Sequence, residues 1–133
     1  MRLKIYTDGA SSGNPGPAAI GVSIKDENGR KLTNFSRYIG ITTNNQAEYR
    51  AVIAALETAV KFKPTGVTLH LDSELAVRQL TGVYRLKSPS IKTLALQARK
   101  LMKKFPHLTI VHINGSENKE AHRLAQAALK RVG

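Results

Sequence analysis

Residues 2–17 read RLKIYTDGASSGNPGP, and this stretch decides the fold class. Apolar and polar side chains alternate over residues 2–8, which predicts a strand. The residues that follow are rich in glycine, serine, asparagine and proline, which are typical of turns. A carboxylate, Asp8, therefore lies at the carboxyl end of the first strand, where α/β sheets usually bind their ligands.

After this stretch the sequence predicts two more early strands, and then strands that alternate with helices. The further strands are expected at residues 18–25, 30–39, 67–72 and 108–113, and the helices at residues 45–62, 74–80, 89–104 and 118–131. The order βββαβααβα favours an α/β protein with a mixed sheet covered by helices. No repeat or linker interrupts the pattern, so residues 1–133 are expected to form a single domain.

The composition favours a folded cytoplasmic protein without a membrane partner. Apolar residues make up 41% of the chain, enough to build a core. The longest apolar runs fall far short of the roughly 20 residues that span a bilayer. Residues 1–5 lead directly into polar residues, without the apolar segment of a signal peptide. The absence of cysteine excludes disulfides and thiolate metal sites.

The charge balance favours a polyanionic partner. Twenty-one lysine and arginine residues against nine acidic ones give a formal net charge of +12. Such an excess is typical of proteins that bind nucleic acid through phosphate contacts and counterion release. A basic structural protein, such as a ribosomal one, would carry the same charge, so charge alone does not separate the two classes.

Three acidic residues hold positions that suit chemistry. Asp8 ends the first strand, Asp72 ends the fourth, and Glu48 lies in the first turn of the long helix. If these two strands are parallel neighbours, their ends lie about 5 Å apart. Clustered carboxylates repel one another unless they are neutralised, and hard oxygen ligands favour Mg²⁺ or Mn²⁺. A two-metal site of this kind suits phosphodiester hydrolysis, because one ion activates water and the other stabilises the leaving oxygen.

Each of these acids also has an ordinary structural interpretation. Asp8 could belong to a plain turn with the next glycine. The spacing from Asn45 to Glu48 is that of a capping box, in which the glutamate reaches back to a backbone N–H. Asp72 could cap the short helix that follows it, together with Ser73. The sequence leaves these alternatives open.

Four ordered motifs resemble the type 1 ribonuclease H family: residues 8–17 (DGASSGNPGP), 43–48 (TNNQAE), 71–73 (LDS) and 118–125 (NKEAHRLA). The resemblance covers the whole chain. It implies a ribonuclease H-like α/β fold, a five-stranded mixed sheet in the order 3-2-1-4-5 with helices on both faces. It also implies an endoribonuclease that hydrolyses the RNA strand of RNA–DNA hybrids and leaves 5′-phosphate and 3′-hydroxyl ends. Two divalent ions would be bound by Asp8, Glu48 and Asp72.

The resemblance also implies how the RNA–DNA hybrid is bound, without an obligate protein partner. Asn14 and Thr43 match positions that contact the backbone of the DNA strand. Asn44, Asn45 and Gln46 match positions that contact bases or sugars in the minor groove. The 2′-hydroxyl is the group by which such a protein separates RNA from DNA.

The chain departs from the family at the fourth carboxylate, where it has His122. On its own, a histidine on an amphipathic helix is usually a surface residue, but its place in the motif makes it a candidate catalytic residue and metal ligand. Imidazole suits Mn²⁺ better than Mg²⁺, so we expect Mn²⁺ to be preferred. Residues 114–117 also lack the histidine that many relatives carry there.

The segment 81–90 is too short for the basic extension that some relatives use to grip the hybrid. Two interpretations of the nearby basic residues stay open, a substitute grip or a solvated helix face: Arg85, Lys87, Lys92, Arg99, Lys100, Lys103 and Lys104. The main rival function is a non-catalytic hybrid-binding module on the same fold. Such a module would have no chemical reason to keep all three carboxylates.

Overall fold

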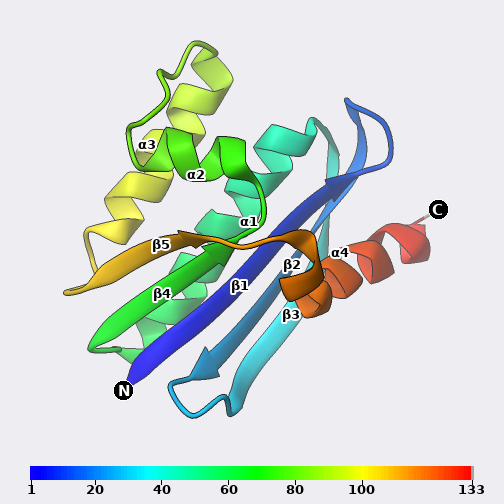
Figure 1. Ribbon diagram of the computed structural model, residues 1–133. Coiled ribbons are helices and arrows are strands. Elements are labelled where there is room, and N and C mark those ends of the chain that lie inside the picture. The colour runs from blue at the N-terminus through cyan, green and yellow to red at the C-terminus, as the bar shows by residue number, and fades with distance from the viewer. Residues whose placement is uncertain (133) are drawn as a thin grey trace.

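The computed structural model describes residues 1–132, which form one five-stranded sheet in the order β3-β2-β1-β4-β5 (Figure 1). The strands are β1 (Arg2–Ser11), β2 (Gly16–Asp26), β3 (Lys31–Thr42), β4 (Gly66–Leu71) and β5 (Leu108–His112). The helices are α1 (Asn44–Ala59), α2 (Glu74–Leu80), α3 (Pro89–Met102) and α4 (Lys119–Val132), with short 3-10 helices η1 (Val60–Phe62) and η2 (Gly115–Glu117). The pairs β1–β2 and β2–β3 are antiparallel, whereas β1–β4 and β4–β5 are parallel. The expected mixed sheet and its strand order are confirmed.

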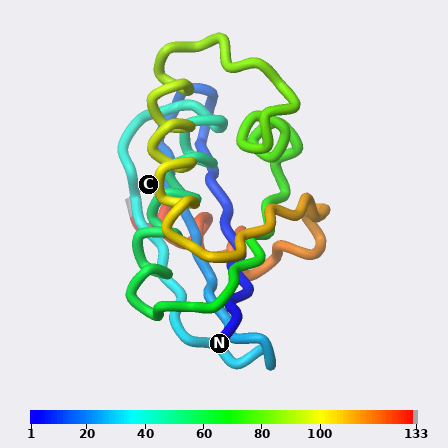
Figure 2. The backbone as a smooth tube through the Cα atoms, turned by 90° about the vertical axis from the view of Figure 1, so that its left-hand side faces the viewer, coloured from blue at the N-terminus to red at the C-terminus, as the bar shows by residue number. Residues whose placement is uncertain are grey.

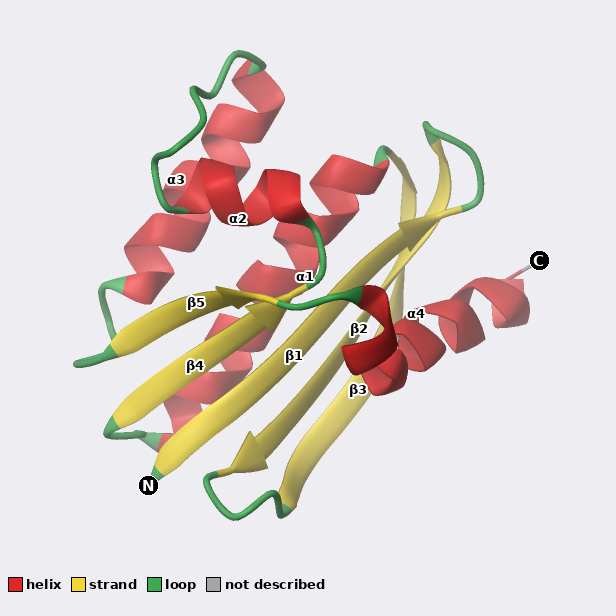
Figure 3. Ribbon diagram, in the orientation of Figure 1, coloured by secondary structure: helices red, strands yellow, loops and turns green. Residues whose placement is uncertain are grey.

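Helices cover both faces of this sheet, as expected. Helices α1 and α3 lie behind the sheet in Figure 1, and α4 crosses β1, β2 and β3 on the other face (Figure 3). The apolar stripe of α1, including Tyr49, Val52 and Leu56, packs on the inward side chains of the strands, such as Ile5 and Leu69. From the side, the loop between α2 and α3 arches over the top of the molecule (Figure 2). No described helix is long and apolar enough to cross a bilayer.

Two glycines allow α1 and α4 to approach the central strands closely. A Cβ atom on Gly9 would lie 2.3 Å from the carbonyl carbon of Ala47 in α1. A Cβ atom on Gly21 would lie 2.0 Å from the carbonyl oxygen of Ala121 in α4. Any larger residue would force the backbones apart, because packed interiors have no slack for a clash of that size. These contacts fix the first turns of both helices against β1 and β2.

The boundaries of several elements differ from expectation. The expected turn at residues 9–17 is shorter, because β1 pairs with β2 up to Ser11 opposite Ala18. A hydrogen bond of 2.7 Å from the Ser12 N–H to the Pro17 carbonyl closes the connection. Strand β3 runs past residue 39 to Thr42, and the connection between β5 and α4 contains η2. Cross-strand pairing thus extends strands into segments with turn composition.

Candidate active site

The parallel pairing of β1 and β4 brings Asp8 and Asp72 together. Thr7 lies opposite Leu71 in the last register pair, so the two aspartates are the next residues at the same edge of the sheet. The first turn of α1 adds Glu48. One carboxylate oxygen from each of the three residues lies within 4.8 Å of the others. The prediction of a shared site assumed that the first and fourth strands are parallel neighbours. The structure confirms this assumption.

Glu48 does not close a capping box. Its Oε1 accepts a hydrogen bond of 2.9 Å from the backbone N–H of Gly9, at the end of β1. Thr43 is the N-cap of α1 instead, and its hydroxyl accepts from the Gln46 N–H at 3.2 Å. The other carboxylate oxygen, Oε2, is buried without a hydrogen-bond partner. A buried acceptor left in this state is costly, which points to a partner that the protein chain does not supply.

Asp72 is not the cap of α2 either. The hydroxyl of Ser73 accepts from the Ala76 N–H at 3.2 Å, which leaves the Asp72 carboxylate free of that role. Asp72 Oδ2 accepts a 3.1 Å hydrogen bond from Nδ2 of Asn118. The same nitrogen donates to the Thr7 carbonyl at 2.8 Å. Asn118 is only 1% exposed, so this amide ties the start of α4 to β1 and to Asp72.

Sequence reasoning assigned no role to Asn118. A polar residue directly before a helix is ordinarily interpreted as a cap, and the residue is separated from Asp72 by 46 positions. Its place in the fourth motif was the one available signal. Its contact with a site carboxylate becomes visible only once α4 is placed on the sheet.

His122 touches one member of the cluster. Its Nδ1 lies 2.9 Å from Oδ2 of Asp8, and its side chain is 58% exposed. The set whose oxygens lie within 4.8 Å of one another contains only the three acids among the described residues. His122, Asp8 and Asp72 together line a groove of about 580 Å³ that also includes Ser11 and Asn44. The histidine is therefore placed beside the cluster, in contact with Asp8.

Burial and mutual repulsion raise the pKa values of two acids of this cluster, Asp8 and Glu48. Burial raises the pKa of Asp8, and the charge of Asp72 adds to the effect, while the hydrogen bond to His122 partly opposes it. Burial raises the pKa of Glu48 well above its ordinary value, and the neighbouring charge of Asp8 raises it further. A cation bound between the three carboxylates would offset both the burial of their charges and the repulsion between them. The donor set, all hard oxygens, and the unpartnered Oε2 of Glu48 therefore fit a divalent ion.

One of the expected hybrid contacts, Asn44, lines this groove, and a second, Asn14, is hydrogen-bonded to it. Asn14 Oδ1 accepts from the Asn44 N–H at 3.0 Å. Asn44 Oδ1 in turn accepts from Ser11, from the N–H at 3.1 Å and from the hydroxyl at 2.7 Å. Asn14 and Asn44 are exposed. The loop after β1 and the start of α1 thus form one connected polar edge.

The other expected contacts lie farther along the first turn of α1. Asn45 donates from Nδ2 to Oε1 of Gln79 at 3.3 Å, and its own Oδ1 is buried without a partner. Gln46 reaches the opposite side of α1, where its Nε2 donates to the Ser90 hydroxyl at 3.0 Å and its Oε1 accepts from Thr42. The five residues therefore surround the start of α1, and Gln46 does not line the groove of the carboxylates.

Comparisons with known proteins agree with this geometry. The model of the reverse transcriptase-like family matches residues 6–128. A ribonuclease HI of Halobacterium salinarum is 41% identical over 128 residues, which cover 96% of this chain and 64% of the relative's length. The crystal structure of ribonuclease H1 from that archaeon is 40% identical and superposes with a TM-score of 0.96, covering 98% of this chain and 99% of that chain. The structure of LC11-RNase H1 in complex with an RNA/DNA hybrid is 44% identical, with a TM-score of 0.93 and 98% of both chains covered.

Proposed function

The chain belongs to the reverse transcriptase-like family of ribonuclease H-type domains, and from that premise we propose that it is an endoribonuclease that hydrolyses the RNA strand of RNA–DNA hybrids. The observation that carries the proposal is the cluster of buried Asp8 and Glu48 with half-buried Asp72 at the carboxyl edge of β1 and β4. A module that only bound a hybrid would gain nothing from three mutually repelling carboxylates beside a phosphate backbone.

Asp8, Glu48 and Asp72, with His122 beside them, would bind two divalent ions, Mg²⁺ or Mn²⁺, next to the RNA phosphate. Bound there, the ions would supply an activated water and stabilise the leaving oxygen, giving 5′-phosphate and 3′-hydroxyl ends. The protein's part is to hold the ligands in place. The Gly9 N–H orients Glu48, and Asn118 orients Asp72. The fixed carboxylates then need no reorganisation when substrate arrives.

We propose that the hybrid is recognised at the start of α1. Asn14 and Thr43 would contact the backbone of the DNA strand. Asn44, Asn45 and Gln46 would contact bases or sugars in the minor groove, where the 2′-hydroxyl distinguishes RNA. The connected edge of Asn14 and Asn44 beside the carboxylates supports this placement. A cytoplasmic location stays a prediction.

The defining test is a substrate comparison at fixed salt. We expect the protein to cut the RNA strand of a labelled RNA–DNA hybrid when Mg²⁺ or Mn²⁺ is present. Single-stranded RNA and double-stranded DNA should remain intact under the same conditions, and EDTA should stop the reaction. Hybrid binding without any cleavage, with either ion, would instead favour the non-catalytic module.

The basic residues at the end of α3 and directly after it supply a second prediction. Lys100, Lys103 and Lys104 are exposed, whereas Arg99 donates to the Gln79 carbonyl at 2.6 Å and is therefore part of the α2–α3 packing. Each phosphate contact contributes about 0.9 to the slope of log affinity against log salt. Replacing the three lysines with alanine should flatten that slope by about 2 to 3 without abolishing cleavage.

The matched control for α3 removes three exposed charges from α4, at Lys119, Arg123 and Lys130. Binding affinity is measured by fluorescence anisotropy between about 50 and 200 mM salt, the range over which phosphate contacts have large effects. The α4 variant should keep the wild-type slope. If the substitutions at Lys100, Lys103 and Lys104 leave the slope unchanged, these lysines are solvated surface residues and the hybrid binds elsewhere on the protein.

A further inference from the structure

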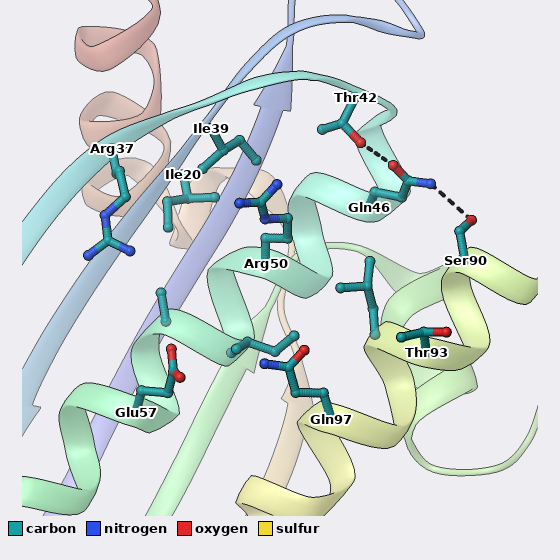
Figure 4. A pocket seen from close by; sticks show the side chains of 13 residues that line it. Ile20, Arg37, Ile39, Thr42, Gln46, Arg50, Glu57, Ser90, Thr93 and Gln97 are labelled. Carbon is teal, nitrogen blue, oxygen red and sulfur yellow. Dashed lines mark hydrogen bonds between the residues drawn. The ribbon is translucent and has the colours of Figure 1, made fainter.

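A second groove, of about 560 Å³, runs along the outer side of α1 (Figure 4). Strand β3 forms one wall and α3 the other, with α1 between them. Gln46 lies at one end, where its side chain is hydrogen-bonded to both Thr42 and Ser90. None of its lining residues lines the groove of the carboxylates. The molecule therefore offers a separate binding surface that begins at the start of α1.

Two arginines line this groove without an acidic partner. The guanidinium of Arg37 lies 5.4 Å from the centroid of the Phe35 ring, and Arg50 turns toward Ile39 (Figure 4). Neither guanidinium forms an ion pair within residues 1–132. Glu57 is the one acidic residue that lines the groove, about two helical turns beyond Arg50. Two guanidinium groups and one carboxylate therefore line the groove, which gives its lining a net positive charge.

Aliphatic side chains complete the surface between these charges. Ile20, Ile39 and Ile53 line the same groove as Arg37 and Arg50. A ligand that suits this surface carries negative charge together with flat apolar groups. Nucleotides have this chemistry, because their phosphates pair with guanidinium groups and their bases pack on apolar or guanidinium planes.

The place of the groove identifies the nucleic acid that would enter it. Gln46, at one end of the groove, belongs to the first turn of α1, where the proposed function places the hybrid. We propose that the groove holds a single-stranded extension of the hybrid substrate, a strand that leaves the duplex past Gln46. This inference rests on the proposed function, since it takes the hybrid at the start of α1 as its starting point.

The stiffness of a duplex excludes it as the occupant. Helix α1 runs from the carboxyl edge of the sheet back along its face, so a ligand in the groove must turn away from the carboxylates (Figure 1). Duplex DNA has a persistence length of about 150 base pairs and resists so sharp a turn, whereas a single strand bends freely. Gln46 and Glu57 are eleven residues apart, or about 16 Å along the helix. A strand with a rise of about 3.4 Å per nucleotide would place about five nucleotides there.

The experiment uses RNA–DNA hybrids whose duplex part has one fixed length. A blunt hybrid is compared with hybrids that carry a single-stranded DNA overhang of up to about ten nucleotides, placed on one end and then on the other. Binding is measured by fluorescence anisotropy in EDTA, so that no strand is cut. We expect at least one overhang to tighten binding by about tenfold, with the gain complete near five nucleotides. The variant Arg37→Gln/Arg50→Gln should lose this gain and bind the blunt hybrid as the wild type does, which also shows that it is folded.

The matched control, Arg30→Gln/Lys130→Gln, removes the same charge from the β2–β3 turn and from α4, and it should keep the gain. The inference is wrong if no overhang tightens binding, if the gain survives in the Arg37/Arg50 variant, or if a double-stranded extension gives the same gain. A protein that neither binds nor cuts the blunt hybrid would overturn the proposed function. A protein that binds the blunt hybrid but gains nothing from an overhang would overturn only the inference about the groove.

Discussion

Replacing Asp8 with asparagine will reduce hybrid cleavage by at least about a thousandfold, which corresponds to about 4 kcal/mol of lost transition-state stabilisation. Asp8 is 4% exposed and shares its cluster with Glu48 and Asp72. An amide of nearly the same shape removes the negative charge that would hold a divalent ion, while the hydrogen-bond partner of His122 is retained. Cleavage is measured on a labelled hybrid with saturating Mg²⁺ and, separately, with Mn²⁺.

The same substitution should stabilise the protein when metal is absent. Burial, together with the charge of Asp72, raises the pKa of Asp8, so the ionised carboxylate costs folding free energy. A loss of about 1 kcal/mol of repulsion would raise the Tm by about 4 °C in a domain of this size. We therefore expect Asp8→Asn to melt a few degrees higher than wild type in EDTA at neutral pH, by circular dichroism.

The pH dependence of this stability has a definite sign. A folded-state pKa above the unfolded value means that the folded protein binds protons more readily. The penalty is therefore fully present at pH values above the raised pKa of Asp8 and Glu48, and it disappears as the pH falls toward about 4, the range of unfolded carboxyls. Metal-free wild type should gain stability relative to Asp8→Asn as the pH falls through that window.

The companion variants Glu48→Gln and Asp72→Asn should lose cleavage in the same way. Glu57→Gln is the matched control, because Glu57 is an exposed acid of α1 outside the cluster and should cleave a blunt hybrid normally. Near wild-type cleavage by the cluster variants would refute the site. An Asp8→Asn protein that melts well below wild type in EDTA would instead show that the carboxylate serves the fold.

The local patterns of the sequence predicted the strands and the α-helices, and they singled out the three acids that the structure brings together. Alternation over residues 2–8 predicted β1, because this pattern depends only on which side chains share a face. The strand order came from the family resemblance. Parallel pairing of β1 with β4 then followed, and it brought Asp8 beside Asp72.

Contacts between distant segments could not be predicted in this way. Asn118 reaches Asp72 only because α4 starts against β1, and Gly21 allows that approach by leaving room for the Ala121 carbonyl. Glu48 has the spacing of a capping box, yet it accepts a hydrogen bond from the Gly9 N–H at the end of β1. In each case the deciding partner lies far away in sequence, beyond any local pattern.

His122 provides the second large prediction, a dependence of the reaction on the metal ion. The histidine is in contact with Asp8 at 2.9 Å and lines the same groove as Asp72. An imidazole nitrogen stands where the family resemblance implies a carboxylate oxygen. Mg²⁺ prefers hard oxygen ligands in near-octahedral geometry, whereas Mn²⁺ accepts imidazole more readily. We therefore expect wild type to cleave faster with Mn²⁺ than with Mg²⁺.

Two substitutions at His122 separate a metal-linked role from a surface role. His122→Asp should raise the Mg²⁺-supported rate and narrow the preference for Mn²⁺, since it supplies a fourth carboxylate. His122→Ala should lose about ten- to a hundredfold with either ion, the range found when groups that orient metal ligands are removed. Arg123→Ala, an exposed neighbour on α4, is the matched control and should behave as wild type with both ions. If the Asp, Ala and wild-type proteins have the same rates with Mg²⁺ and with Mn²⁺, His122 is a surface residue and the three carboxylates suffice.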